Sequence, residues 1–168
     1  EPTFEPGTWF GLRHDAEQRI SHDGILQCWE QANDLLCGAA RQDLVSVHDP
    51  DEYLAAATDA PDKARRRRDI LEAYQALFDL RNARKARAVG VGSKDWRGVR
   101  WIADEGALGW VMRACSFTIL HHPPELLAFI ADLHRRGVAI LNSAVFHAGF
   151  LTGGKYFDYR APSPNDPA

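Results

Sequence analysis

The sequence predicts a parallel α/β fold in which short strands alternate with amphipathic helices. Apolar runs of strand length recur along the chain, and helix-length segments with a 3.6-residue hydrophobic period separate them. The strand segments are almost continuously apolar, which is typical of strands covered on both faces. Parallel strands connected in this way need right-handed crossovers. The pattern alone leaves two architectures open, an open doubly wound sheet and part of a (β/α) barrel.

The composition indicates one ordinary soluble domain over residues 1–168. Hydrophobic residues make up 45% of the chain and charged residues 26%, and the formal net charge is -3, so there is no general attraction to nucleic acid or an anionic membrane. No apolar run approaches the roughly 20 residues that span a bilayer. Cys28, Cys37 and Cys115 form no C-x-x-C pair, which favours buried thiols in a reducing, cytoplasmic setting. The chain opens at Glu1 without a methionine, so we expect it to be part of a longer protein.

The first half of the chain supplies two helices and two strands. Residues 1–20 hold prolines and aromatic residues without a clear period, so we expect a lead-in loop there. Ser21 is a suitable N-cap, and Gly38 a suitable terminator, for the helix between them. An apolar stripe that includes Ile70 and Tyr74 marks a longer helix. The predicted elements are a helix over 22–36, a strand over 44–47, a polar stretch over 49–63, a helix over 66–85 and a strand over 87–92.

The second half continues the alternation and ends in a loop. Ser93 and Asp95 are the side chains expected at the start of a helix. Pro124 suits the first turn of the next helix, whose buried stripe is predicted to be Leu127, Ile130 and Leu133. The predicted elements are a helix to about residue 104, a strand over 111–117, a helix over 124–135, a strand over 138–142, a glycine-bearing loop over 143–154 and a mobile, proline-rich tail over 161–168.

His48 is the first candidate for a functional residue. It stands where the strand over 44–47 ends, and Asp49-Pro50-Asp51 then turns the chain away. In parallel α/β folds chemistry gathers at the carboxyl ends of strands, because the loops there vary on a rigid sheet. A neutral imidazole at this place would polarise, or donate to, a substrate carbonyl oxygen. The alternative is a histidine that is hydrogen-bonded to a nearby carboxylate and has no further role.

Two glycine-rich segments are similar to phosphate-binding motifs but fail their patterns. Gly90-Val-Gly-Ser93 has Asp95 where the dinucleotide fingerprint needs a glycine, so it either lets a ligand approach the backbone or forms a tight turn. The segment from Gly149 to Lys155 fits most of a P-loop, but Tyr156 replaces the serine or threonine that holds magnesium. Its three glycine amides would still suit a pyrophosphate without a metal.

The remaining polar clusters indicate neither a metal site nor a nucleic-acid site. His121, His122 and His147 lack the spacing of a zinc site, so no metal is predicted. The arginine run at 65–68 enters an amphipathic helix without interleaved aromatic residues, which indicates a solvated helix face. We therefore expect a small-molecule ligand and neither nucleic acid nor membrane.

Five short stretches of the sequence, taken in their order along the chain, resemble those of a known protein family. They are Asp43-Leu-Val-Ser-Val-His-Asp-Pro-Asp51, Ala76-Leu-Phe-Asp-Leu-Arg81, Ala88-Val-Gly-Val-Gly92 with Trp96, Phe117-Thr-Ile-Leu120, and Leu141-Asn-Ser-Ala-Val-Phe-His-Ala-Gly-Phe-Leu-Thr-Gly153. In this order they resemble the aldo-keto reductases, nearest to the sugar-oxidising branch of L-galactose, L-fucose and D-threo-aldose dehydrogenases. The resemblance extends from Ser21 to Tyr159.

The resemblance implies an eight-stranded (β/α) TIM-type barrel, of which this chain is the middle, strands four to seven. His48 then matches the catalytic-site histidine that orients the substrate carbonyl. Phe117 falls where relatives place an aromatic residue that stacks on the nicotinamide, and Val145 replaces a common proline in the loop that wraps the pyrophosphate. Ser93 lies in the loop that contacts the carboxamide, without a clean Ser-Asn pair. The implied cofactor-binding residues are Ser93, Phe117, Ser143, Ala144, Val145, Phe146, Gly149 and Leu151.

The function implied by this resemblance is that of an NAD(P)-dependent oxidoreductase acting on an aldehyde, an aldose or a related carbonyl or alcohol. The family's catalytic tyrosine, with its lysine and aspartate, belongs to earlier strands, so we expect this segment alone to be inactive. The choice between NAD and NADP stays open, because the unit that binds the 2′-phosphate is not in the chain.

Two other functions stay open at this point. The first is a non-catalytic barrel remnant that binds a partner or forms a homo-oligomer through exposed strand edges near 44–47 and 138–142. The second is a flavodoxin-like nucleotide binder built on an open sheet, which the strand order would distinguish.

Overall fold

The computed structural model describes residues 16–158, 160–164 and 166, and it shows one parallel sheet with helices packed against it. The first 15 residues of the predicted lead-in loop, with its aromatic residues, lie outside the described residues. The strands are β1 Leu44–His48, β2 Ala88–Ser93, β3 Trp110–Ala114 and β4 Ala139–Ser143. The helices are α1 His22–Leu36, α2 Pro50–Ala55, α3 Ala60–Asn82, α4 Trp96–Glu105, α5 Pro124–Arg135 and the short 3-10 helix η1 Phe150–Thr152.

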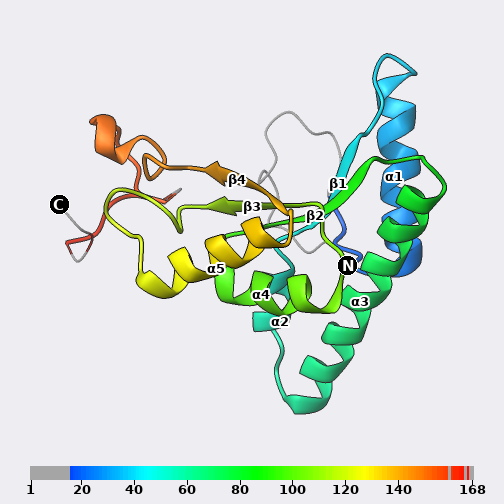
Figure 1. Ribbon diagram of the computed structural model, residues 1–168, viewed down its shortest axis with the longest axis horizontal. Coiled ribbons are helices and arrows are strands. Elements are labelled where there is room, and N and C mark those ends of the chain that lie inside the picture. Colours follow the sequence, from blue (N-terminus) through cyan, green and yellow to red (C-terminus); the bar gives the residue numbers. More distant parts are fainter. Residues whose placement is uncertain (1–15, 159, 165, 167–168) are drawn as a thin grey trace.

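The order of the strands decides between the two architectures. The sheet runs β1-β2-β3-β4, and every neighbouring pair is parallel. Each crossover therefore moves to the next strand in the same direction, which leaves the crossover helices on one face, as in a (β/α) barrel. Figure 1 shows α3, α4 and α5 beneath the sheet. The prediction of a partial barrel is confirmed, and the open doubly wound sheet, which reverses its strand order, is wrong.

The face of the sheet that meets the helices carries the core. The register aligns Val91 with Val111, and Val89 lies two residues earlier on the same face. These valines pack against side chains from the helices that include Ile70 of α3 and Phe129 of α5, and all five residues are fully buried. Burying a side chain of this kind contributes about 1.5–3 kcal/mol to folding. The alternation of valines along the strands thus fixes which face turns toward the helices.

The opposite face of the sheet is covered unevenly. Trp110 lies across Gly90, so that a Cβ added to Gly90 would be 2.2 Å from the indole ring. Only glycine at this position leaves room for the indole. On β1, by contrast, Leu44 is 54% exposed and His48 is exposed as well. The expectation that both faces are covered is therefore correct for the centre of the sheet and wrong for β1, whose Leu44 and His48 side chains are exposed on the face opposite the core.

Helical structure follows β1 sooner than the sequence predicts. Pro50 occupies the first turn of α2, so the predicted polar stretch over 49–63 contains a helix. Asp59 caps α3 by accepting a hydrogen bond from a backbone amide in its first turn. The helix consequently begins at Ala60 and ends at Asn82, whereas the apolar stripe alone predicts 66–85.

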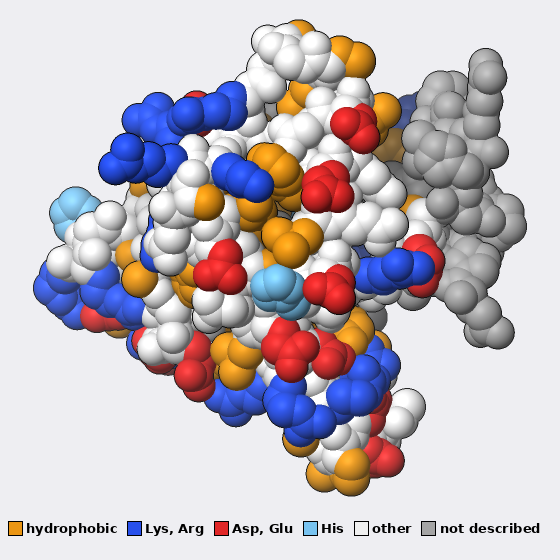
Figure 2. All heavy atoms as spheres, turned by 90° about the vertical axis from the view of Figure 1, so that its right-hand side faces the viewer, with side chains coloured by type: hydrophobic (Ala, Val, Ile, Leu, Met, Phe, Trp, Pro, Cys, Tyr) orange, Lys and Arg blue, Asp and Glu red, His pale blue; other side chains and the backbone are white. Residues whose placement is uncertain are grey.

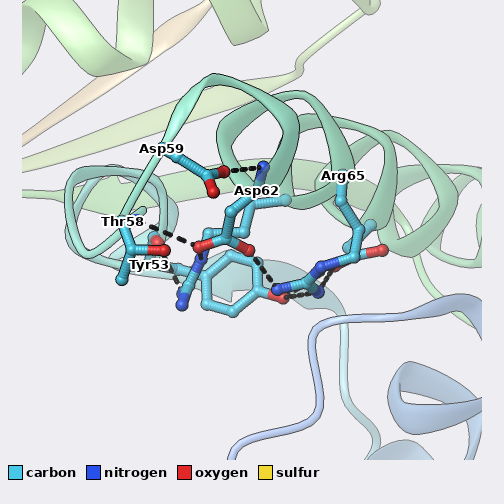
Figure 3. Close-up of polar contacts among 7 residues, drawn as sticks. Tyr53, Thr58, Asp59, Asp62 and Arg65 are labelled. Carbon is cyan, nitrogen blue, oxygen red and sulfur yellow. Dashed lines mark hydrogen bonds and ion pairs between the residues drawn. The ribbon is translucent and has the colours of Figure 1, made fainter.

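A polar cluster fixes the corner between α2 and α3 (Figure 3). Asp62 accepts hydrogen bonds from the Thr58 amide and from Arg65. Arg65 also binds Asp69 at 2.8 Å, and the Tyr53 hydroxyl donates to the same carboxylate at 2.7 Å. The start of the arginine run is therefore a solvated, ion-paired helix face, as the sequence predicts.

Two details of the second half differ from the sequence prediction. β3 ends at Ala114, three residues early, because Cys115 has a φ of 59°, which a strand does not accommodate. In α5 the fully buried stripe consists of Leu126, Phe129 and Leu133, whereas Leu127 is 44% exposed. The buried residues are spaced by three and then four positions, which follows the 3.6-residue helical period. The predicted residues are spaced by three positions each time, and such a series turns away from the buried face of the helix.

The molecular surface is of mixed character. Figure 2 views the side from which α1 and α3 project and shows acidic, basic and hydrophobic side chains together. Within the described ranges, no helix is long and apolar enough to cross a membrane. Within the described residues no disulfide joins the three cysteines, and Cys28 and Cys37 are exposed. The expectation of buried thiols is wrong for these two, because Cys28 lies off the packed stripe of α1 and Cys37 follows its last turn.

Candidate cofactor and active site

The sequence-predicted site residues lie at one edge of the sheet. His48, Ser93 and Ser143 are the last residues of β1, β2 and β4, and Phe117 follows the end of β3 by three residues. Parallel strands have their carboxyl ends at the same edge. Figure 1 shows the loop after β4, drawn in orange, extending from this end. His48 and Phe117 therefore share one end of the sheet, as a common ligand site requires.

His48 presents its imidazole to solvent at the mouth of the partial barrel. Its side chain is 86% exposed, and the alternation of the strand places it on the face opposite the core valines. Asp49 follows with a φ of 41°, and its amide still donates to the Gly92 carbonyl of β2 at 2.9 Å. The backbone thus leaves the sheet immediately after His48, so the ring is free to meet a ligand.

A carboxylate and an ammonium group flank this histidine. Asp49 Oδ2 lies 3.9 Å from His48 Nε2 and 3.5 Å from Lys94 Nζ. Burial raises the pKa of the Asp49 carboxyl, and the charges of His48 and Lys94 oppose that rise. A 2.7 Å hydrogen bond to Glu52 raises the pKa of Lys94, so this group stays protonated at neutral pH. Asp49 and Lys94 are not among the sequence-predicted site residues, although each directly follows one of them.

Ser93 lies at the correct edge, but its side chain is used locally. It is 3% exposed, and its hydroxyl donates to the Asp95 carbonyl at 3.2 Å, next to the start of α4. His48 is paired with Gly92, so the next residue, Ser93, points to the other face of the sheet. The structure therefore does not bring the side chains of Ser93 and His48 together. The role of Ser93 toward a cofactor stays a prediction.

Phe117 covers a buried cation. The Arg113 guanidinium carbon lies 5.6 Å from the centre of the Phe117 ring, and Arg113 is 1% exposed. Its Nε and Nη1 atoms have no hydrogen-bond partner among the described residues. Burial lowers the pKa of the guanidinium. The Phe117 carbonyl accepts a hydrogen bond from Asn142 at 3.0 Å, which links the ends of β3 and β4.

The loop that follows β4 leaves backbone amides available to an anion. Ala144 is left-handed, with a φ of 53°. The amides of Ala144, Val145 and Phe146 have no hydrogen-bond acceptor within the described part of the chain. Successive free amides beside a left-handed residue form the kind of concave nest that binds phosphate oxygens. The residues present therefore fit the pyrophosphate of a dinucleotide.

The P-loop-like segment from Gly149 to Lys155 is built differently from a P-loop. A single turn, η1, follows Gly149 in place of a long helix. The Gly149 amide donates to Phe146 at 3.0 Å, Gly153 to Phe150 at 3.0 Å, and Gly154 to Gly149 at 2.9 Å. The expectation that these three glycine amides hold a pyrophosphate is wrong, because they already close the loop on itself.

His147 is the most tightly held titratable side chain of this loop. Its Nε2 lies 2.7 Å from Thr118 Oγ1, and its Nδ1 lies 2.7 Å from Asp158 Oδ1. The ring is stacked on Phe157 at 4.6 Å between centroids, and His147 is 3% exposed. From the sequence, His147 is only a weak candidate for a metal ligand and a member of the loop from Ser143 to Leu151. In the described ranges there is no group of three or more metal-ligating side chains.

A cavity of about 580 Å³ opens beside this histidine. Its lining comes from the start of α4, the end of β3 and the last described segment, and it includes Lys94, Arg97, Ser116, His121 and His147. None of the residues predicted to bind the cofactor lines it. The cavity and the nest at Ala144 are thus separate features of the same edge.

Comparison with known proteins assigns the family. The model of the aldo/keto reductase family matches residues 10–168, nearly the whole chain. The chain belongs to the aldo/keto reductase family. This agrees with the strand order and with the site at the carboxyl edge, whereas the narrower branch of sugar dehydrogenases is not decided by the match.

Individual aldo/keto reductases show how much of the fold this chain contains. It is 27% identical over 163 residues to a pyridoxal 4-dehydrogenase of Microbacterium luteolum, covering 93% of the chain and 46% of that protein. A Bombyx mori aldo-keto reductase in complex with NADP superposes with a TM-score of 0.56 at 19% identity, covering 89% of the chain and 45% of that structure. An aldo/keto reductase of Brucella melitensis gives 0.50 at 14% identity, with 73% and 41% covered. The chain therefore spans less than half the length of these relatives.

Proposed function

We propose that this chain is the dinucleotide-binding part of an NAD(P)-dependent oxidoreductase and presents His48 to a carbonyl or alcohol substrate. The observation that carries the proposal is the nest of free amides at Ala144, Val145 and Phe146, at the same edge as His48. The NADP in the Bombyx mori relative supports NADP as the cofactor.

Each part of the site has a place in this proposal. The loop from Ser143 to Leu151 holds the pyrophosphate through its amides at Ala144, Val145 and Phe146, and Phe117 offers an aromatic face at the end of β3. When bound, the cofactor supplies or accepts the hydride at the substrate carbon. His48 donates to the substrate oxygen and orients it for that transfer. Asp49 faces the imidazole, with its Oδ2 atom 3.9 Å from His48 Nε2.

The substrate class is proposed more narrowly than the family alone requires. We expect an aldehyde, an aldose or the corresponding alcohol, as in the branch of L-galactose, L-fucose and D-threo-aldose dehydrogenases. The pyridoxal 4-dehydrogenase relative supports a dehydrogenase activity. A panel of aldoses and aldehydes assayed with NADP and NAD on the protein that contains this chain would test the class. Turnover of none of them would exclude it.

The described tyrosines do not supply the proton donor of the reaction. Tyr53 lies on α2, Tyr74 on α3, and Tyr156 in the segment after η1, so none of these three is at the carboxyl end of a strand. Tyr159 lies outside the described residues. General acid catalysis contributes about 10²–10⁴-fold to a rate, so we expect the 168 residues alone to bind cofactor with little or no turnover.

Cofactor binding by the chain itself tests the proposal directly. NADPH fluorescence is titrated against the unmodified chain and against a matched pair, Ala144→Gly and Ala144→Val. Glycine accepts the φ of 53°, so binding is retained. A β-branched residue is a stronger outlier than alanine in the left-handed conformation, which predicts weaker NADPH binding by Ala144→Val. No NADPH binding by the unmodified chain refutes the proposal.

A second candidate function rests on the edges of the sheet. β1 and β4 each have one hydrogen-bonded neighbour within the described residues, and Leu44 on β1 is 54% exposed. Unpaired edges favour pairing with another chain, so the chain is also a candidate for a non-catalytic module that self-assembles. Sedimentation of the purified chain separates the two functions: a dimer that does not bind NADPH supports the module, and an NADPH-binding monomer excludes it.

A further inference from the structure

The loop after β4 is held in an unfavourable backbone conformation. Ala144, His147 and Ala148 all have positive φ, at 53°, 48° and 57°, and none of them is glycine. Side chains with a Cβ avoid this region, so such residues persist only where the surrounding structure fixes them. Something outside the loop must therefore hold it, and the backbone hydrogen bonds within the loop do not reach the sheet or its neighbours.

The His147 side chain is the connection from this loop to its surroundings. One ring nitrogen meets Thr118 in the β3–α5 connection, and the other meets Asp158 in the segment after η1, both at 2.7 Å. Phe157 stacks on the ring with an interplanar angle of 8°. A single buried imidazole thus joins three segments that are far apart in the sequence.

For a neutral ring, the chemistry of the partners gives one direction to each of these hydrogen bonds. An ionised carboxylate only accepts, so the Nδ1–H of His147 donates to Asp158. In the neutral ring Nε2 then accepts from the Thr118 hydroxyl. The His121 amide donates to the same Thr118 oxygen at 3.0 Å, which leaves the hydroxyl proton for the imidazole. Every polar atom of the ring is therefore satisfied in one arrangement.

We propose that His147 is a positioning residue for the dinucleotide: clamped by Thr118 and Asp158, it holds the left-handed loop so that the amides of Ala144, Val145 and Phe146 stay available to a phosphate. The inference rests on the proposed function and adds the contacts that hold these three amides in place before the dinucleotide binds. Pre-organisation of this kind lowers the ordering cost of binding and so tightens it.

Two clamp variants and one matched control test the proposal. Thr118→Val keeps the shape of the side chain and removes the hydroxyl that binds His147. Asp158→Asn removes the carboxylate and keeps a residue type tolerated at the φ of 45° found there. Thr152→Val is the control, because it removes a hydroxyl of η1 that, among the described residues, bonds only to the Gly149 carbonyl, at 2.8 Å. Each protein is measured by amide hydrogen exchange and by NADPH titration.

We expect both clamp variants to raise exchange at the bonded loop amides, which include His147, Gly149 and Leu151, and to weaken NADPH binding about tenfold. The Thr152→Val control should match the unmodified chain in NADPH affinity. Unchanged loop exchange in both clamp variants overturns the inference, and so does faster exchange with unchanged NADPH affinity, which would make the clamp structural only. A lack of NADPH binding by the unmodified chain refutes the proposed function and, with it, the positioning role of His147.

Discussion

Replacement of Arg113 by methionine is expected to stabilise the chain. Arg113 is buried to 1% exposure at the end of β3, and two of its three guanidinium nitrogens have no hydrogen-bond partner among the described residues. Its recorded partner is the ring of Phe117, at 5.6 Å. The burial that lowers the pKa of this group also opposes its charged form during folding.

The expected gain follows from the balance of these terms. An unpaired buried ion costs several kcal/mol, and a cation–π contact such as that with Phe117 returns about 0.5–2 kcal/mol. Methionine fills a similar space, and a sulfur–aromatic contact replaces part of the lost attraction with about 0.3–1.5 kcal/mol. We therefore expect Arg113→Met to raise the free energy of unfolding by about 1–3 kcal/mol, or Tm by about 2–12 °C.

Urea unfolding followed by far-UV circular dichroism measures this difference, with Arg113→Lys as the matched control. Lysine keeps an amino group that must be desolvated and loses the planar contact with the ring, so it should give less gain than methionine. A less stable Arg113→Met protein would refute the reasoning, because it would show that the guanidinium has a partner worth more than its desolvation. Equal stabilisation by Lys and Met would refute it as well, since the charge would then not be the cause.

Two further predictions concern the fold around the site. Gly90→Ala places a Cβ 2.2 Å from the Trp110 ring and should destabilise the chain by about 1–3 kcal/mol in urea unfolding, whereas Gly92→Ala, with no atom within 4 Å of its Cβ, should be close to neutral. A hydrogen bond from the Thr58 amide, aided by neighbouring arginines, lowers the pKa of Asp62 from 3.8 to about 2. Its stabilising effect is therefore complete above about pH 4 and is lost as the pH falls toward 2. An Asp62→Asn protein should lose less stability over that interval in acid unfolding, and an identical pH profile would contradict this.

Much of the fold follows from local rules that the sequence displays. Ser21 caps α1 through its hydroxyl, which accepts from the Gly24 amide, and Asp95 caps α4 in the same way. The alternation of strand and helix placed all four strands correctly to within three residues. The choice of a barrel did not follow from such rules, since periodicity does not encode strand order. It came from the resemblance, and the order β1-β2-β3-β4 confirms it.

The geometry of the candidate site follows from the same reasoning only in part. The strand ends predict that His48, Ser93 and Ser143 share one edge of the sheet, because parallel strands must bring their carboxyl ends together, and the structure has them there. Which face a side chain takes depends on register, and a shift of one residue reverses it. Ser93 is therefore at the right edge and on the wrong face to meet His48, while Lys94, its neighbour, reaches Asp49 beside that histidine.

Three residues of the candidate site have a backbone conformation that sequence patterns do not predict. Asp49, Ala144 and His147 are non-glycine residues in left-handed backbone conformations, which composition alone assigns to glycine or asparagine. The conformation is stable at His147 because Thr118 and Asp158, 29 and 11 residues away, satisfy both ring nitrogens. A strained turn held by distant partners has no local signature. The site of this chain thus depends on tertiary contacts at the points where its backbone leaves the sheet.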